Sequence, residues 1–356
     1  MWPDTRLLDL FGIELPIVQA PMANATAVDM AVAVAEAGGL GSFPCAALAD
    51  EKIGAGVAEI RSRTKRPINL NFFCHKPAPA DAERDAAWLK RLAPYYAELG
   101  AEMPKVPLTA SIVAFTEATC AVVEKLRPEV VSFHFGLPDA ALVARVKKAG
   151  CKIISSATTL REALWLAEHG VDAIIAQGAE AGGHRGMFLE TDVATQIGTL
   201  ALVQQIVAAV PLPVIAAGGI GDGRGIAASF ALGASGVQIG TAYLGCPEAT
   251  VSALHRTALA EPGRQTVITN VLSGRPARGI LTRFVREQGP IKAAIPAYPL
   301  ATPALSPLRS KAEAKGSGAF SWFWSGQGAP PPTGLGAKEL TRKLADDALA
   351  RLKELA

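Results

Sequence analysis

A glycine-rich loop that carries a histidine is the segment of this 356-residue chain best suited to chemistry. The loop Gln177–Gly186, QGAEAGGHRG, directly follows the apolar run Ala173–Ala176, which has the composition of a buried strand. His184 can donate or accept a proton near neutral pH, while Gly182 and Gly183 leave the backbone open to a flat ligand. Active sites of α/β proteins lie at the carboxyl ends of strands. The loop therefore predicts a cofactor site with an acid/base residue.

A second histidine, His134, lies in the segment SFHFGLP, where Gly136 and Pro138 are expected to turn the chain from a strand into a helix. We expect His134 to face the same cavity as His184 and to take part in catalysis. A histidine between two phenylalanines is alternatively a hydrogen-bonded core residue. Arg185, beside His184, is either a solvated or loop-fixing cation or a group that attracts an anionic substrate.

Two further glycine-rich segments predict a phosphate site. Residues 216–225, AAGGIGDGRG, lie between a strand-like run and a helical pattern, and residues 237–241, VQIGT, end the next strand. Backbone N–H groups left open by glycine, together with a helix N-terminus, bind phosphate without a cation. The alternative is that these glycines form ordinary turns. The residues expected to bind the phosphate end of a cofactor are Gly218, Gly219, Gln238, Gly240 and Thr241.

Earlier strand ends offer groups that suit a flat ring. Ala20 and Met22 follow the first strand in QAPM, and Asn69 begins the polar and aromatic segment NLNFF. Amide side chains can hydrogen-bond the polar edge of a ring, and backbone atoms at Ala20 and Met22 can lie against its face. Phe72 is expected in the substrate pocket. Met22 is alternatively a core thioether, and an asparagine in this segment a turn residue.

Short apolar runs alternate with alanine-rich helical patterns along the first 250 residues, which predicts a parallel sheet. Eight such strands predict a (β/α)8 barrel. The expected strands are 16–20, 39–43, 68–72, 130–133, 152–156, 173–176, 213–217 and 236–239. The expected helices are 28–37, 82–99, 117–126, 140–149, 160–169, 195–209 and 223–232.

The alternating pattern stops after Thr250, and residues 274–332 are rich in proline, glycine, serine and aromatic residues. Such a segment is typical of a lid or a small second domain. We therefore predict a cofactor-binding barrel over residues 1–258, a lid or substrate-pocket region over 259–332, and a C-terminal helix within 333–356 that packs on the barrel.

Composition excludes several classes of protein. The 35 basic and 32 acidic residues give a net charge of +3 without a basic block, which argues against nucleic acid as a partner. No apolar run approaches the roughly 20 residues needed to span a bilayer, and no signal peptide is recognisable, so we expect a soluble, cytoplasmic protein without a membrane partner. Five cysteines without a CxxC spacing, and the lack of HxH or HExxH motifs, argue against a metal site.

In chain order, the segments QAPM, SFHFGLP, AQGAEAGGHRG, AAGGIGDGRG and QIGTAYL resemble the nitronate monooxygenase family. The resemblance covers roughly Pro16–Leu244 and returns at Trp324–Gly328. It implies FMN at the C-terminal mouth of the barrel and a role in nitroalkane detoxification. The implied reaction is the oxidation of an alkyl nitronate, with propionate-3-nitronate suspected, by dioxygen to a carbonyl compound and nitrite.

The same resemblance implies roles for individual residues. Met22 and Asn69 would contact the flavin ring or ribityl chain, and Gln177 and Gly182 the ring edge. His184 matches the histidine that abstracts a proton from neutral nitroalkanes, and His134 matches a second pocket histidine. Tyr298 resembles a pocket tyrosine. The polar positions that often follow this tyrosine are Thr302 and Ser306 here, which leaves the size and identity of the substrate open.

Two other enzyme classes compete with this interpretation. The barrel and its loops also resemble flavin-dependent NAD(P)H reductases of quinones or of enoyl-acyl carrier protein, and the GGHRG histidine occurs there too; SFHFGLP favours the monooxygenase. A phosphosugar isomerase or decarboxylase without flavin would use a lysine or carboxylate at a strand end, where this chain has glutamine, asparagine and histidine. The oligomeric state stays open.

Overall fold

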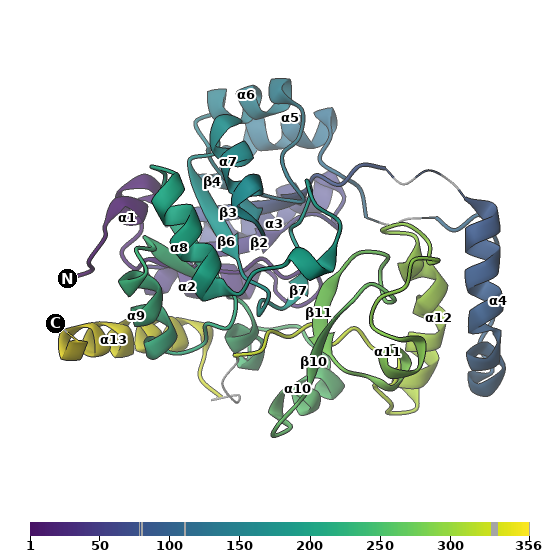
Figure 1. The fold of residues 1–356 in the computed structure, drawn as a ribbon. Helices are drawn as coiled ribbons and strands as arrows, with labels where there is room; N and C mark the ends of the chain where they lie inside the picture. Colours follow the sequence, from purple (N-terminus) through teal and green to yellow (C-terminus); the bar gives the residue numbers. More distant parts are fainter. Residues whose placement is uncertain (78, 80, 110–111, 329–333, 356) are drawn as a thin grey trace.

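Eight parallel strands form one sheet in the computed structural model, which describes residues 1–77, 79, 81–109, 112–328 and 334–355 (Figure 1). The sheet order is β1-β9-β8-β6-β5-β4-β3-β2. A parallel bridge from Val18 to Leu40 joins its two edges, and the Leu40 amide donates to the Ile17 carbonyl at 2.9 Å. The strands are β1 Ile17–Gln19, β2 Gly41–Pro44, β3 Ile68–Phe73, β4 Val130–His134, β5 Lys152–Ala157, β6 Ala173–Gln177, β8 Val214–Ala217 and β9 Gly236–Ile239.

Helices cover the outside of this barrel, so the predicted (β/α)8 architecture is confirmed (Figure 1). The helix over 50–63 was not predicted, because its two glycines and few apolar residues obscure the helical pattern. The C-terminal helix packs against α2 and α9 and adds Leu340 and Leu344 to the core. The outer helices are α2 Val28–Ala37, α3 Asp50–Arg63, α5 Glu117–Leu126, α6 Ala140–Lys148, α7 Leu160–Glu168, α8 Thr199–Ala209, α9 Gly223–Ala231 and α13 Ala337–Leu355.

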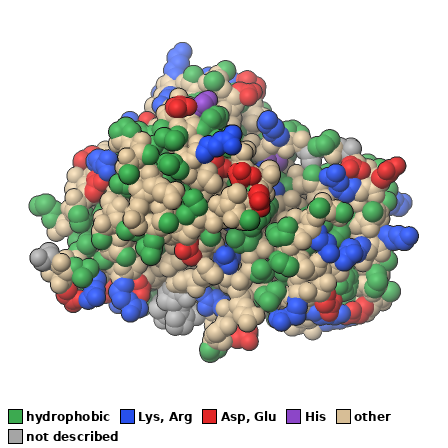
Figure 2. All heavy atoms as spheres, viewed as in Figure 1, with side chains coloured by type: hydrophobic (Ala, Val, Ile, Leu, Met, Phe, Trp, Pro, Cys, Tyr) green, Lys and Arg blue, Asp and Glu red, His purple; other side chains and the backbone are tan. Residues whose placement is uncertain are grey.

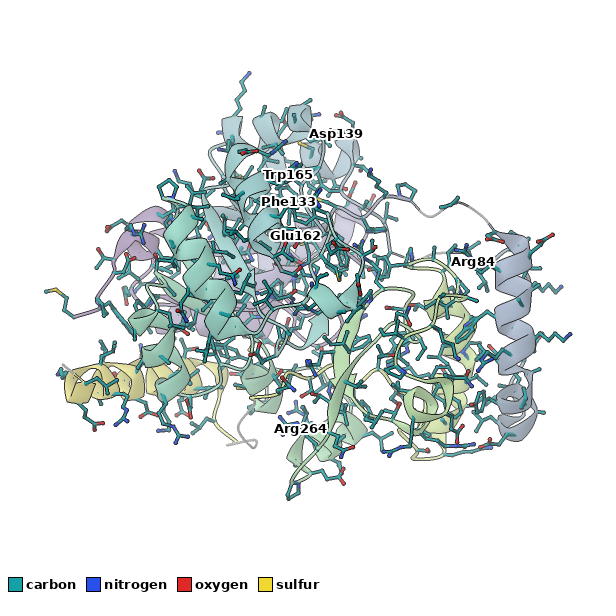
Figure 3. All side chains as sticks on the ribbon, viewed as in Figure 1. Arg84, Phe133, Asp139, Glu162, Trp165 and Arg264 are labelled. Carbon is teal, nitrogen blue, oxygen red and sulfur yellow. The ribbon has the colours of Figure 1, made fainter. Side chains whose placement is uncertain are left out.

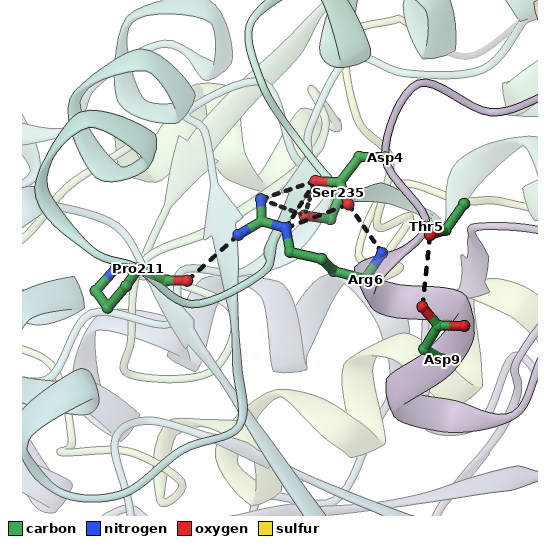
Figure 4. A network of polar contacts seen from close by, with 6 residues as sticks. All are labelled: Asp4, Thr5, Arg6, Asp9, Pro211 and Ser235. Atoms are coloured by element: carbon green, nitrogen blue, oxygen red, sulfur yellow. Dashed lines mark hydrogen bonds and ion pairs between the residues drawn. The ribbon is translucent and has the colours of Figure 1, made fainter.

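The amino-terminal end of the barrel is closed by helix α1, Arg6–Phe11, whose Leu7 and Phe11 pack into the barrel interior. Beside it, Arg6 bonds the Asp4 carboxylate at 2.7 Å and the Ser235 hydroxyl at 3.1 Å (Figure 4). These contacts tie the start of the chain to the loop before β9. This end of the barrel is therefore structural, which leaves the carboxyl ends of the strands for the site.

A second lobe lies beside the barrel and has its own hydrophobic core (Figure 1). Its three-stranded antiparallel sheet has the order β10-β11-β7, and β7 is the short segment Gly183–His184 from the predicted active-site loop. The lobe therefore holds the candidate base directly. Its remaining elements are β10 Thr266–Thr269, β11 Ala277–Ile280, α10 Ala253–Ala260, α11 Arg283–Gln288 and α12 Ala301–Ala314.

Helix α4, Ala82–Leu99, belongs to the core of this lobe rather than to the helical layer around the barrel. Its Trp88, Leu92 and Tyr96 are buried there, and the Tyr96 hydroxyl donates to the Ala304 carbonyl of α12 at 2.5 Å. The helix was predicted at these residues, but its packing partner was not. The predicted domain boundaries stay predictions.

Charged side chains of both signs are interspersed on the face of the molecule in Figure 2. Within the described residues, none of the helices combines the length and apolar character needed to cross a bilayer.

Candidate active site

A cavity of about 430 Å³ opens at the carboxyl ends of the barrel strands. Its walls come from every predicted glycine loop and from the second lobe, so residues far apart in the chain meet there. The predicted site residues among its lining are Ala20, Met22, His134, Gln177, Gly182, Gly183, His184, Gly218, Gly219, Gln238, Gly240, Thr241 and Tyr298.

Two predicted residues do not line this cavity, and both lie on β3. Phe72 was expected in the substrate pocket, but its ring packs on Phe115, 5.0 Å between centroids, in the core between sheet and helices. Successive strand side chains point to opposite faces, so the lining residue is Phe73. Asn69 points inward but lies deeper, where its amide donates to the Ser42 and Ser132 hydroxyls at 2.9 Å.

His184 is positioned by the second lobe. Its Nε2 lies 2.8 Å from the hydroxyl oxygen of Ser273, and that hydroxyl donates to the Arg275 carbonyl at 3.2 Å. Because Ser273 has a single hydroxyl hydrogen, the bond to the carbonyl leaves its oxygen to accept from Nε2–H. Within the described residues no hydrogen bond reaches Nδ1, so this tautomer presents Nδ1 as an open acceptor. Ser273 could not be identified from the sequence, because it is a lone serine in an irregular segment.

His134 uses both ring nitrogens inside the protein. Its Nε2 lies 3.1 Å from the His184 carbonyl oxygen, and its Nδ1 lies 3.2 Å from the Ser156 hydroxyl. A carbonyl only accepts, so Nε2 carries the hydrogen and Nδ1 accepts from Ser156. His134 thus lines the cavity as expected, but its bonds hold the backbone of the next histidine and leave no free nitrogen.

The loop Gln177–Gly186 is fixed by buried polar groups. The fully buried Arg185 donates to the carbonyls of Gln177 and Gly178, both at 2.6 Å, which makes it a loop-fixing cation. The Gln177 side chain bridges the same loop: Nε2 donates to the His184 carbonyl at 3.0 Å, and Oε1 accepts from the Gly186 amide at 2.7 Å. One N–H of Gln177 therefore stays available to a ligand.

A buried carboxylate secures the far end of the same region. Glu162 of α7, marked in Figure 3, accepts from the Phe188 amide at 2.6 Å and from the Thr158 amide at 2.7 Å. The segment after His184 is thus tied to the barrel as well as to the second lobe. A histidine anchored on both sides is preorganised for chemistry.

Three glycine-containing segments meet at the end of the cavity that suits a phosphate group. Gly218 has a φ of +125°, a conformation that L side chains rarely adopt, and a Cβ on Gly182 would approach within 2.5 Å of the Gly326 nitrogen. The Gly326 amide donates to Thr241 Oγ1 at 2.9 Å, which leaves that hydroxyl hydrogen for a ligand. Bare backbone and a free hydroxyl suit an anionic group.

Unsatisfied polar atoms mark where a ligand would bind. Gln238 Oε1 and the Tyr298 hydroxyl are buried and have no hydrogen-bond partner within the described residues. Buried polar atoms are normally paired, so a ligand with a donor near Gln238 and an acceptor near Tyr298 would satisfy both. Burial raises the pKa of Tyr298, which keeps its phenol protonated. Its ring lies 5.3 Å from that of His184, between centroids.

His184 and His134 are both neutral at physiological pH. Burial lowers the pKa of His184 to about 3, with smaller contributions from His134 and the Arg275 guanidinium. Burial likewise lowers the pKa of His134 to about 4. A neutral imidazole with an open Nδ1, beside a phenol donor, can accept a proton from carbon while the phenol bonds an oxygen of the same molecule. No group of three or more metal-ligating side chains occurs in the described parts of the chain.

Comparisons with known proteins identify relatives over nearly the whole chain. The family model described as nitronate monooxygenase matches residues 4–347. A nitronate monooxygenase of Pseudomonas aeruginosa is 44% identical over 346 residues, which cover 96% of this chain and 98% of that protein. A nitroalkane oxidase from Streptomyces ansochromogenes superposes with a TM-score of 0.90 at 37% identity, covering 98% and 99% of the two chains. FabK from Thermotoga maritima superposes with a TM-score of 0.74 at 28% identity, and the match covers 98% of this chain and 97% of FabK.

Proposed function

Because the chain belongs to the nitronate monooxygenase family, we propose that it uses FMN and dioxygen to oxidise alkyl nitronates to a carbonyl compound and nitrite. Membership makes it a flavin-dependent oxidoreductase. The observation that carries the proposal is His184, a neutral histidine with one open nitrogen at the mouth of a barrel whose loops suit a flat, phosphorylated cofactor.

The residues at the mouth of the barrel fit FMN. The unpaired Gln238 Oε1 can accept from a ring N–H or a ribityl hydroxyl, and the backbone at Gly218 and Gly219 suits the phosphate. Ala20 and Met22 offer backbone and thioether contacts to a ring face. Bound FMN supplies the electron acceptor for the nitronate and a route to dioxygen.

His184 is proposed as the base for neutral nitroalkanes. Its Nδ1 takes the proton from the carbon that bears the nitro group, and the Tyr298 hydroxyl donates to a nitro oxygen. The imidazolium then lies beside the nitronate anion, and opposite charges attract strongly in a cavity that excludes water. Ser273 and His134 are positioning residues, because one sets the tautomer of His184 and the other holds its carbonyl.

A substrate that is already a nitronate needs no base. It is a carbanion equivalent, so the protein has only to orient it and bind its oxygens. The same residues therefore matter less for nitronates than for nitroalkanes.

Product analysis tests the proposal. Purified protein loaded with FMN is mixed in air with ethyl nitronate or with propionate-3-nitronate, the substrate that the family resemblance suggests. We expect nitrite and a carbonyl product to appear as dioxygen is consumed. Lack of nitrite from both compounds, together with rapid NADH or NADPH oxidation by a quinone, would instead support a flavin reductase.

A further inference from the structure

We propose that the active-site cavity contains an aromatic chamber that selects nitronates with an aromatic or branched apolar substituent over those with a carboxylate. The chamber is the part of the cavity lined by Val251, His255, Trp322, Phe323 and Trp324. This inference rests on the proposed function and specifies its substrate class.

The chamber begins beside the candidate base. The Trp324 ring lies 5.3 Å from the His184 ring, between centroids, so a substrate whose reacting carbon is near His184 has room to place its substituent against this indole. Next to it, His255 stacks on Phe323 at 5.0 Å with an interplanar angle of 23°. His255 Nε2 donates to the Trp324 carbonyl at 3.2 Å, and burial lowers the pKa of His255 to about 4. This histidine is therefore a neutral part of an aromatic wall.

The chamber offers no unpaired cation to a carboxylate. Apart from histidines, the charged residues in the described lining are Arg309 and Glu313, one helical turn apart on α12. Arg309 Nε lies 2.9 Å from Glu313 Oε1, and the guanidinium lies 4.5 Å from the centre of the Trp322 ring. The same Glu313 oxygen accepts from the Ser321 hydroxyl at 2.7 Å. Glu313 balances the charge of Arg309, so a substrate carboxylate gains little net attraction from this guanidinium and is repelled by the Glu313 carboxylate beside it.

The polar residues of α12 near this region do not replace the missing cation. Thr302 lines the cavity with a small uncharged side chain. The Ser306 hydroxyl donates to the Thr302 carbonyl at 2.9 Å, so its hydrogen is used within the helix. The chamber therefore favours a substrate whose substituent is a ring or a branched apolar chain. Its walls are aromatic rings, a valine and a neutralised ion pair, and they attract a substituent mainly by burying its apolar surface.

Three nitronates test the selectivity: ethyl nitronate, propionate-3-nitronate and the nitronate of 1-nitro-2-phenylethane. We expect kcat/KM for the phenyl compound to exceed that for ethyl nitronate about tenfold or more, and propionate-3-nitronate to be the poorest. If ethyl nitronate is turned over but kcat/KM for the phenyl compound is no higher, or kcat/KM for propionate-3-nitronate is the highest, the proposed selectivity is wrong and the proposed function still holds. Failure of all three with bound flavin overturns the proposed function itself.

Two variants locate the selectivity in these residues. Trp322→Ala should lower kcat/KM for the phenyl compound about tenfold more than it lowers kcat/KM for ethyl nitronate. Glu313→Gln removes the competing carboxylate and should raise kcat/KM for propionate-3-nitronate, relative to kcat/KM for ethyl nitronate, by about tenfold. Glu354→Gln, which breaks the Arg351 pair on α13, is the matched control and should leave all ratios unchanged. The proposal is wrong if the ratios of kcat/KM among the three nitronates are unchanged in both Trp322→Ala and Glu313→Gln.

A binding measurement without turnover separates recognition from chemistry. 2-Phenylethanol should quench the tryptophan fluorescence of the FMN-bound protein, and 3-phenylpropionate should do so only at concentrations about tenfold higher or more. Trp322→Ala should weaken 2-phenylethanol binding. Equal affinity for the alcohol and the carboxylate would count against the chamber.

Discussion

Replacing His184 with asparagine separates the two chemical steps that the site is proposed to perform. Asparagine keeps a polar side chain at this position but cannot accept a proton at Nδ1, which is open in the structure. A positioned general base contributes about 10²–10⁴-fold to a proton transfer. We therefore expect His184→Asn to lower kcat/KM for nitroethane by about 10²-fold or more. For ethyl nitronate, which has no proton to lose at that step, we expect less than about a tenfold change.

The assay follows dioxygen consumption with nitroethane and with freshly prepared ethyl nitronate, using enzyme of equal flavin content. His169→Asn is the control, since His169 is an exposed histidine that stacks on Trp165 at 3.8 Å between ring centroids. It should leave both activities unchanged. Equal losses on both substrates in His184→Asn would refute the base role, because they would indicate lost binding or lost flavin.

Three more perturbations follow from the hydrogen bonds and pKa values. Ser273→Ala removes the acceptor for His184 Nε2–H and should lower nitroethane turnover about tenfold, which is the contribution of one orienting hydrogen bond. Turnover of ethyl nitronate should change little, and Ser273→Thr should restore nitroethane turnover. Equal effects on both substrates would contradict this expectation. Arg185→Met removes the donors to the Gln177 and Gly178 carbonyls and to Gln196 Oε1, and should lower the unfolding free energy in urea by about 3 kcal/mol; a loss below about 1 kcal/mol would contradict this expectation. Burial lowers the pKa values of four histidines from the ordinary 6.5 to about 3–4, so below pH 6.5 the unfolded chain binds protons that the folded chain does not. Stability should therefore be level above about pH 7 and fall toward pH 4 by up to about 1.4 kcal/mol per pH unit for each histidine, as measured by urea unfolding; a midpoint unchanged between pH 7 and pH 5 would contradict this. The four histidines are His75, His134, His184 and His255.

The barrel and the meeting of its loops were predictable because both depend on local sequence. Apolar runs of strand length alternate with helical patterns, and parallel strands direct all their carboxyl ends to one edge. The glycine loops after β6, β8 and β9 therefore had to converge. His184 could be identified as a candidate from its loop alone.

Features that depend on tertiary packing were not predictable. Phe72 and Phe73 are adjacent phenylalanines, and only the register of β3 decides which one lines the cavity. Helix α12 contains Pro307 inside its span, which argued against a helix in the sequence. Ser273 acquires its role by lying near a residue 89 positions away.

The catalytic role of His134 stays a prediction, and its hydrogen bonds favour a positioning role instead. Its position at a strand end indicated chemistry, but its nitrogens are occupied by the Ser156 hydroxyl and the His184 carbonyl. Sequence patterns place a side chain at an edge of the sheet, whereas hydrogen-bond partners come from other strands and loops.

Nitronate oxidation is tested most directly by anaerobic mixing of the purified, flavin-bound protein with ethyl nitronate in one cell and with NADH or NADPH in another. The flavin absorbance is then followed in both cells. We expect rapid bleaching by the nitronate and none by the nicotinamides. Bleaching by a nicotinamide alone would contradict this expectation, since the barrel would then serve a reductase rather than an oxidase of nitronates.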